Sequence, residues 1–417
     1  MTDRELLVQL FDAAVAAADP VGALKPNLPE KPLGKTVVVG AGKGAAQLAR
    51  AFETLWDGPL SGVVVTRYGY AEACSSINVM EASHPVPDAA GLKASRALID
   101  AVTGLSEDDL VVALICGGGS SLLPAPTAGL TLEDEQELNR VLLASGAPIS
   151  VMNAIRKQVS DIKGGRLAKA AWPAKVVSLV VSDVPGDDPA QVASGPTVPD
   201  NISPADALAM AAAYRINLPD RIRQHIENAL QAPTPADLEF QRNDVSIVAS
   251  AAISLDAAAK TASELGLDSV VLSDSIEGEA REIARMHGAM ARETSRRNRP
   301  FRKPVVMLSG GETTVTLRGN GRGGRNTEFL LSLAIDIDGE AQVSALAADT
   351  DGIDGSEDNA GAFVDGGSCA RLRMAGRDPA ADLANNDAFS AFEAVGDLFS
   401  PGPTGTNVND FRAILVR

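Results

Sequence analysis

Histidine, cysteine and aromatic residues are scarce in this sequence. Among 417 residues there are three histidines and three cysteines, and aromatic residues make up 4%. The cysteines Cys74, Cys116 and Cys369 include no CxxC pair, and their odd number argues against a disulfide framework. No cluster of histidine and cysteine indicates a zinc site. A serine hydrolase is disfavoured, because there is no G-x-S-x-G motif and no histidine placed as the partner of a nucleophile.

Basic residues are also few, since 37 lysines and arginines stand against 54 aspartates and glutamates, giving a formal charge of −17. Such a surface repels nucleic acid and anionic membranes, so we expect neither as a partner. No apolar run approaches the length of a membrane span. Residues 1–18 have the pattern of an acidic amphipathic helix rather than of a signal peptide. Together with unpaired cysteines, these features predict a cytoplasmic protein.

The sequence is rich in long apolar segments that end in glycine. Their positions are 35–45, 61–70, 108–123 and 175–188. Helical patterns lie between them, at 45–56, 89–105 and 132–146. Continuously apolar strands that alternate with helices predict an α/β protein with a mostly parallel sheet. The proline-rich piece QAPTP at 231–235 marks a domain boundary, after which the rhythm of strands and helices restarts.

The first glycine-rich turn is VVVGAGKGAA at 37–46, a strand that runs into a helix. Exposed amides at the start of that helix, together with Lys43, would form an anion site. Gly40, Gly42 and Ala45 also satisfy the dinucleotide fingerprint G-x-G-x-x-G/A. A lysine inside that turn is unusual for the fingerprint, and no acidic residue follows the next strand. A plain tight turn is the remaining alternative.

The second turn is ICGGGSS at 115–121. Three consecutive glycines allow the backbone to approach a ligand closely, and two serines add hydroxyl groups. A glycine and serine loop after a strand is a reasonable phosphate cradle, with an ordinary strand–helix turn as the alternative. We therefore assign a cofactor-binding role to Gly117, Gly118, Gly119, Ser120 and Ser121.

The third stretch, SGGETTVTLRGNGRGGRNTEF at 309–329, places three arginines in a flexible segment of an acidic protein. It reads as strand, turn and strand, then a glycine-rich loop, then a helix. Arg325 lies at the first turn of that helix, where the helix dipole and the guanidinium both favour an anion. Glu312 is a candidate for holding a cation. A solvated hairpin is the alternative, but the three arginines favour the binding of an anionic ligand.

Acidic residues follow two of the apolar strands, as Asp183, Asp187 and Asp188, and again as Asp349, Asp351 and Asp354. Carboxylates at strand ends beside phosphate loops hold Mg²⁺ in phosphoryl-transfer sites, although several of these residues are expected to serve turns and helix caps. Two polar loops are further candidates. His84 lies in SHPVPD, while Asn407, Asn409 and Asp410 lie in GPTGTNVND and suit either a polyhydroxy ligand or local turns.

These motifs, together with SDVPGDDPAQVASGPTVPD at 182–200 and AADTDGIDGSEDNAGAFVD at 347–365, resemble the class II glycerate kinases of the MOFRL family. The resemblance runs nearly end to end. It implies a Rossmann-like N-terminal domain with a mostly parallel sheet, at 1–235, and a smaller mixed α/β MOFRL domain, at 236–417. The active site is expected in the cleft between the two domains. The implied reaction uses ATP and Mg²⁺ to phosphorylate D-glycerate at its 2-hydroxyl.

The resemblance also suggests roles for single residues. Lys43 and Arg325 fall where the family has its catalytic lysine and arginine. The remaining expectations are Gly311 and Glu312 for the cofactor, His84, Asn326 and Asn407 for the substrate, and Asp183 and Asp351 for the metal. The protein is expected to be a monomer or a homodimer.

Two other functions remain open at this point. Family members are often named hydroxypyruvate reductase, and the fingerprint in the first turn invites an NAD(P)H-dependent enzyme. That alternative is disfavoured because no histidine and glutamate pair presents itself for hydride chemistry. A non-catalytic sensor of sugar acids is weaker still, since it would not need several glycine-rich anion loops.

Overall fold

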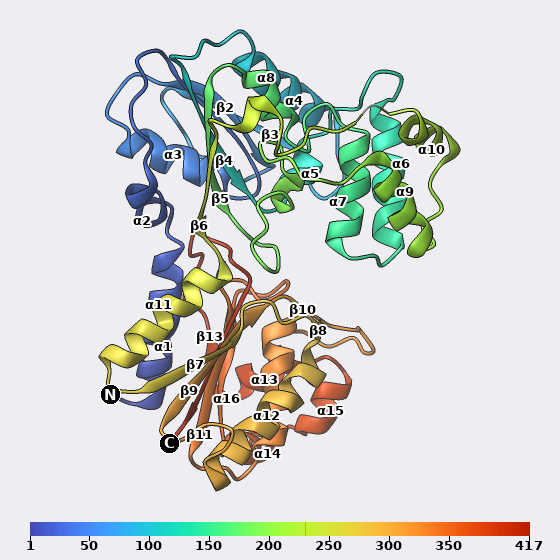
Figure 1. The fold of residues 1–417 in the computed structure, drawn as a ribbon. Coiled ribbons are helices and arrows are strands. Elements are labelled where there is room, and N and C mark those ends of the chain that lie inside the picture. Colours follow the sequence, from blue (N-terminus) through green and yellow to red (C-terminus); the bar gives the residue numbers. More distant parts are fainter. Residues whose placement is uncertain (230) are drawn as a thin grey trace. The chain divides into compact units, whose positions relative to one another are not determined.

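The computed structural model describes residues 1–229 and 231–417, and these form two compact units (Figure 1). One unit is Pro20–Val248, and the other combines Met1–Asp19 with Ala249–Arg417. The expected boundary after residue 235 therefore differs from the observed division. No single helix of the described residues is long and apolar enough to cross a membrane, while the pair Asp3–Ala17 and Pro20–Asn27, bent by 53°, passes on length and composition alone.

Two elements account for the difference in boundary. The N-terminal helix α1 (Asp3–Ala17) packs against α11 (Ala251–Glu264), so it belongs with the C-terminal half of the chain. Strand β6 (Asp244–Ala249) follows the proline-rich piece, yet it forms the last strand of the first sheet. Proline therefore marks a loop inside the first unit rather than its end.

The first unit contains a six-stranded sheet in the order β3-β2-β1-β4-β5-β6. Its strands before β6 are β1 (Thr36–Ala41), β2 (Ser61–Arg67), β3 (Ile77–Ala82), β4 (Leu110–Cys116) and β5 (Lys175–Val181). The pairs β1 with β2, β1 with β4, β2 with β3 and β4 with β5 are all parallel, which confirms the expected mostly parallel sheet. The order reverses between β1 and β4, the point at which ligands bind in open α/β sheets.

Helices cover this sheet because its strands are apolar on both faces. All residues of β1 and β4 are buried. The helices near the sheet are α2 (Pro20–Leu24), α3 (Ala45–Leu55), α4 (Ala89–Val102), α5 (Gly119–Leu122) and α8 (Arg166–Ala171). Helix α4 begins where Asp88 accepts a hydrogen bond from the backbone of Gly91 at 2.9 Å, which satisfies one exposed donor of its first turn.

A group of four helices, called the helical lobe here, lies beside the sheet in the same unit (Figure 1). They are α6 (Leu132–Ala144), α7 (Ile149–Gln158), α9 (Pro204–Ala213) and α10 (Asp220–Glu227). The lobe has its own apolar core, which includes Leu138, Ile155 and Ile222. Capping boxes at Thr131 and Ser203 fix the starts of α6 and α9.

The second unit contains a mixed six-stranded sheet in the order β13-β12-β11-β14-β9-β7. The strands are β7 (Asp268–Ser273), β9 (Val305–Gly311), β11 (Val343–Asp349), β12 (Gly361–Asp365), β13 (Leu398–Phe399) and β14 (Asp410–Val416). Only β7 and β9 pair in parallel among the pairs of this sheet, so the expected mixed sheet is confirmed. Two short strands, β8 (Gly278–Glu279) and β10 (Thr313–Thr314), pair separately.

The two faces of this sheet bury two apolar clusters. Helices α1 and α11 cover one face, as Figure 1 shows, with Leu10, Phe11 and Leu255 in the contact. The other face is covered by α12 (Ala280–Arg297), α13 (Arg325–Asp336), α14 (Ser368–Met374), α15 (Pro379–Ala384) and α16 (Ala388–Val395).

Candidate active site

The first two glycine-rich turns are bonded to each other at the carboxyl ends of β1 and β4. The backbone N–H of Lys43 donates to the carbonyl of Gly117 at 2.9 Å. Gly42 has φ +135°, and a Cβ there would lie 2.3 Å from the carbonyl oxygen of Cys116. The close approach of the two turns therefore requires glycine at position 42. This juxtaposition follows from the parallel pairing of Ala41 with Ile115.

Three of the predicted site residues surround the second turn. Gly118 has φ +78°, and a Cβ on it would lie 2.9 Å from Cγ of Lys43 and 3.1 Å from Nε2 of His84. A Cβ on Gly117 would lie 1.9 Å from Oδ2 of Asp183. Lys43, His84 and Asp183 therefore lie together against the glycine backbone. The structure thus brings together one cation, one imidazole and one carboxylate at the switch point of the sheet.

His84 is neutral at neutral pH. Burial, together with the nearby positive charges of Lys43 and Arg67, lowers its pKa to about 4. A neutral imidazole presents one donor and one acceptor, so it suits a hydroxyl group better than it suits a phosphate. This fits the expected contact of His84 with the substrate.

The third glycine of this turn packs against a strained segment. A Cβ on Gly119 would lie 2.5 Å from Cβ of Ala193. Ala193 has φ +53° and Ser194 has φ +60°, and both residues are buried. Left-handed backbone at residues other than glycine costs about 1–3 kcal/mol each and is concentrated at functional sites. The sequence analysis did not single out either residue.

The hydroxyl groups of this loop are already engaged in hydrogen bonds. Ser194 donates to Oδ1 of Asn153 at 2.9 Å, so its own oxygen is left to accept from Ser120 at 2.5 Å. Ser121 donates weakly to the carbonyl of Gly118 at 3.3 Å. Ser120 is therefore the start of an internal hydrogen-bonded chain. Because its proton points to Ser194, its oxygen can only accept a hydrogen bond from a ligand unless the hydroxyl rotates.

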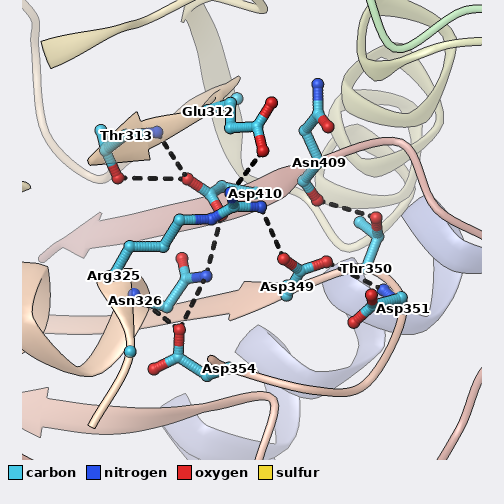
Figure 2. Close-up of polar contacts among 12 residues, drawn as sticks. Glu312, Thr313, Arg325, Asn326, Asp349, Thr350, Asp351, Asp354, Asn409 and Asp410 are labelled. Carbon is cyan, nitrogen blue, oxygen red and sulfur yellow. Dashed lines mark hydrogen bonds and ion pairs between the residues drawn. The ribbon is translucent and has the colours of Figure 1, made fainter. Parts of the chain in front are cut away.

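The second group of predicted residues gathers around Arg325 in the other unit (Figure 2). Nε of Arg325 donates to Asp410, Nη1 to Glu312 and Nη2 to Asp349, each at 2.6 Å. Burial alone would lower the pKa of Arg325, but the charges of Asp410, Asp349 and Glu312 outweigh it, so the pKa lies above its ordinary value. Arg325 is charged at every pH of interest, and all three of its nitrogens face carboxylates.

The sheet creates this cluster. Strands β9 and β11 flank β14 and run opposite to it, so Gly311 and Asp349 both pair with Asp410. The carboxyl ends of two strands and the start of a third therefore meet at one edge. Arg412, fully buried on β14, forms an ion pair with Asp410 from behind and donates to the carbonyl of Gly310 at 3.2 Å. Arg412 was missed because FRAILVR reads as a plain apolar strand.

Asn326 holds the start of helix α13 rather than facing outward. Its backbone N–H donates to Asp354 at 2.9 Å, its side-chain amide donates to Asp410 at 2.9 Å, and the residue is fully buried. Its Oδ1 has no hydrogen-bond partner among the described residues. Burial raises the pKa of Asp354 to about 6, against the lowering effect of its hydrogen bonds from Asn326 and Thr327.

The remaining predicted residues lie near the edge of the same cluster. Asp351 accepts from the backbone of Ile353 at 2.8 Å, and Asn407 accepts from the backbone of Asn409 at 3.1 Å. Both side chains therefore stabilise turns in the structure. Gly311 has φ +119°, and a Cβ there would lie 2.2 Å from the backbone nitrogen of Ile276, so the chain allows no larger residue.

The proposed metal ligands Asp183 and Asp351 belong to different units. Within residues 1–229 and 231–417, no group of three histidine, cysteine, aspartate or glutamate side chains is arranged to hold a metal ion by itself. Magnesium at phosphoryl-transfer sites takes one or two carboxylates together with phosphate oxygens and water. Single carboxylates such as Asp183 beside Gly117 and Glu312 beside Arg325 fit that requirement, and the assignment stays a prediction.

Comparison with known proteins shows the family to which the chain belongs. A family model described as a domain of unknown function, DUF4147, matches residues 6–227, and the MOFRL family model matches residues 305–410. The D-glycerate 2-kinase of Thermotoga maritima is 39% identical over 98% of this chain and 97% of its own. The chain belongs to the glycerate kinase family with a MOFRL domain.

Solved structures extend the likeness to the whole fold. The crystal structure of a glycerate kinase from Thermotoga maritima matches with a TM-score of 0.91 and 38% identity, covering 99% of both chains. A relative from Agrobacterium vitis that carries the provisional name hydroxypyruvate reductase is 52% identical over 99% of this chain and 94% of its own. Both names that the sequence analysis weighed therefore occur among the relatives.

Proposed function

We propose that the protein transfers the terminal phosphoryl group of ATP to the 2-hydroxyl of D-glycerate, giving 2-phosphoglycerate and ADP. The observation that carries the proposal is Lys43 held against the Gly117–Gly118 backbone at the switch point of the first sheet. Phosphoryl transfer depends on positioning and on positive charge around the phosphate more than on a nucleophilic side chain. The family membership supports the acceptor, and the 2-position rests on the names of the Thermotoga and Pyrococcus relatives.

The residues at the glycine turns fit phosphate oxygens. At Gly117, Gly118 and Gly119 a Cβ would come within 3 Å of neighbouring atoms, so these positions have no room for a side chain. The loop therefore presents bare backbone. Lys43 supplies positive charge beside that surface, and Asp183 supplies a carboxylate. When bound with the nucleotide, Mg²⁺ would neutralise charge on the phosphate oxygens.

Arg325 requires a change of partners before it can bind an anion. Of its three carboxylates, the side chain of Asp410 is fully buried and that of Asp349 is 8% exposed, whereas that of Glu312 is 57% exposed. Glu312 is therefore the partner that an incoming phosphate or carboxylate can displace at the lowest cost. Asp349 and Asp410 would keep the guanidinium oriented. That Lys43 and Arg325 act on one phosphoryl group stays a prediction.

The alternative is an NAD(P)H-dependent hydroxypyruvate reductase. The strand order and the fingerprint glycines Gly40 and Gly42 are those of dinucleotide-binding folds, which is the observation in its favour. However, β2 ends at Arg67, where such folds place an acidic residue for the ribose. Thr66 just before it donates to the carbonyl of Lys43 at 3.0 Å, which ties the turn to the second strand.

One experiment separates the two functions. Purified protein is incubated with ATP, Mg²⁺ and D-glycerate, and phosphorus NMR follows the product, while a parallel sample holds NADH and hydroxypyruvate. A 2-phosphoglycerate resonance with stable NADH supports the kinase. A 3-phosphoglycerate resonance would correct the position, and NADH oxidation without a phosphorylated product would overturn the proposal. Lys43→Met should abolish turnover, whereas Lys93→Met, at an exposed lysine of α4, should not.

A further inference from the structure

Three charged side chains are buried together where the helical lobe meets the glycine loops. Lys163 is 3% exposed, Glu135 of α6 is 7% exposed, and Arg156 of α7 is partly buried beside them. Two positive charges and one negative charge therefore share a poorly solvated space. Buried charges are expensive unless they are paired, so an unequal set calls for a compensating partner.

The protein itself supplies neutral partners for the two cations. Arg156 donates to Oδ1 of Asn139 at 2.6 Å and to Oδ1 of Asn153 at 3.1 Å. Lys163 donates to the carbonyl of Leu123 at 2.5 Å. Within the described parts of the chain, neither cation forms an ion pair with a carboxylate. Lys157, the neighbour of Arg156 on α7, differs from both because it pairs directly with Asp200.

The electrostatic consequences agree with that count. Burial lowers the pKa of Arg156 to about 10, although the charge of Glu135 acts in the opposite direction. Burial also lowers the pKa of Lys163; the charge of Glu135 opposes this effect, and the positive charge of Arg156 adds to it. Each cation is thus destabilised in its charged form, and a bound anion would relieve both.

A small cavity of about 20 Å³ opens between these groups. Its polar lining consists of Ser120, Ser121, Glu135, Asn139, Arg156 and Lys163. A space of this size holds about one water-sized group, such as one oxygen of a carboxylate. The cavity therefore begins at the glycine loop and ends at the two cations.

The cavity is held in shape by the hydrogen-bonded chain that starts at Ser120. Ser194, in the strained left-handed segment, links Ser120 to Asn153, and Asn153 in turn accepts from Arg156. The amide nitrogen of Asn153 donates to the carbonyl of Gln191 at 3.0 Å, which fixes the direction of its oxygen. The backbone strain at Ser194 is thus connected to the position of the guanidinium.

We propose that this cavity receives one oxygen of the carboxylate of the hydroxy-acid acceptor, with Arg156 and Lys163 as its ligands; the assignment of the acid as an acceptor rests on the proposed function. The net charge of the three side chains is one positive charge, which matches a monoanionic carboxylate better than a phosphate dianion. A glycerate held there lies beside the loop that packs against Lys43. Arg156 and Lys163 would then determine specificity for acids over neutral polyols.

The test measures binding and stability separately. Calorimetry follows D-glycerate, glycerol and ADP with wild type and with Arg156→Gln, Arg156→Lys and Lys163→Met. We expect Arg156→Gln and Lys163→Met to weaken D-glycerate binding about tenfold or more and to leave ADP binding within about twofold. Arg156→Lys should lose less. Arg140→Gln, at an exposed arginine of α6, is the matched control and should bind like wild type.

The melting temperature distinguishes a ligand site from a structural role. Arg156→Gln relieves repulsion with Lys163 but also loses the hydrogen bonds to Asn139 and Asn153, so its melting temperature is compared together with its affinity for D-glycerate. Should it melt lower while D-glycerate binding is unchanged, the cavity is structural and the proposal is wrong. Weakened ADP binding with unchanged D-glycerate binding would also overturn it, because the cavity would then take a nucleotide phosphate.

The proposed function can fail independently. If wild type binds D-glycerate through Arg156 but forms no phosphoglycerate, the carboxylate site stands and the kinase assignment falls. If wild type phosphorylates D-glycerate and the variants keep its KM, the kinase stands and the carboxylate site falls. Glycerol should bind more weakly than D-glycerate in wild type and equally weakly in Arg156→Gln.

Discussion

Arg325 donates from Nε to Oδ1 of Asp410 at 2.6 Å, and the side chain of Asp410 is fully buried. The arginine that the sequence marks for an anion is thus first of all the counter-charge of the protein's own acids. Arg412 pairs with Asp410 as well, whereas Asp349 relies on Arg325 alone among the ion pairs of the described residues. Arg325 therefore contributes to stability and, on the proposed function, to catalysis.

Arg325→Ala should unfold more easily as well as lose activity. The substitution leaves Asp349 buried without a counter-charge, and breaking a buried pair costs about 3 kcal/mol. Urea unfolding followed by circular dichroism measures the change. Arg325→Ala/Asp349→Asn should recover most of the lost stability and none of the activity. Recovery of both, or a single variant with wild-type turnover, would exclude a catalytic role for Arg325.

Glu312→Gln should change the Mg²⁺ dependence of activity while losing little stability, unlike Arg325→Ala. Because the side chain of Glu312 is 57% exposed, its ion pair with Arg325 contributes about 1 kcal/mol at most to stability. On the proposed function, however, Glu312 leaves Arg325 and faces the metal and nucleotide, so the Mg²⁺ concentration for half-maximal activity should rise. Glu264→Gln, which breaks an exposed pair with Lys260 on α11, is the matched control. Equal Mg²⁺ dependence in both variants would argue against a metal contact.

The elements that could be predicted from sequence are those with a simple pattern. Strands β1, β2, β4 and β5 were expected, because continuous apolar runs that end in glycine leave few other options. Strand β3, INVMEA, was not, since Asn78 and Glu81 interrupt its apolar residues. Helix α1 was recognised as amphipathic, but the identity of the surface it covers depends on contacts with residues more than 200 positions away.

The candidate site could also be predicted only in part. That Lys43 would meet the second glycine loop follows from the meeting of carboxyl ends in a parallel sheet. Of the three carboxylates around Arg325, Asp349 was expected at a strand end, Glu312 in a turn and Asp410 in a polar loop, and no pattern in the sequence paired them with the arginine. Arg156 and Lys163 were missed because each stands in an ordinary helical or turn context, and only burial separates them from surface cations.

Gly118→Ala tests whether the second loop positions Lys43. Its φ of +78° costs an alanine about 1 kcal/mol, and the added Cβ would press on Lys43 at 2.9 Å and on His84 at 3.1 Å. Gly104→Ala is a matched control, because Gly104 has φ +76° with no atom within 4 Å of an added Cβ. Both variants should lose similar stability, while Gly118→Ala alone should lose kcat/KM, by about tenfold or more. Equal activities of the two variants would show that the loop does not position Lys43.

His287 should make stability depend on pH. It is 1% exposed, its Nδ1 lies 2.9 Å from the carbonyl of Ile283, and its Nε2 lies 3.0 Å from Oγ of Ser309. The carbonyl can only accept, so Nδ1 carries the proton and Nε2 accepts from the serine, which requires a neutral ring. Burial lowers the pKa of His287 to about 4 from an ordinary 6.5.

The sign follows from proton linkage. Between pH 6.5 and 4 the unfolded chain binds a proton at His287 that the folded protein does not, so this contribution to the free energy of unfolding falls as the pH falls. It is fully present above pH 6.5 and amounts to about 3 kcal/mol at 1.36 kcal/mol per pKa unit. Urea unfolding of wild type and of His287→Gln should therefore converge as the pH drops from 7 towards 4. A difference that stays constant over this range would mean that the ring is already protonated in the folded protein or is freely solvated.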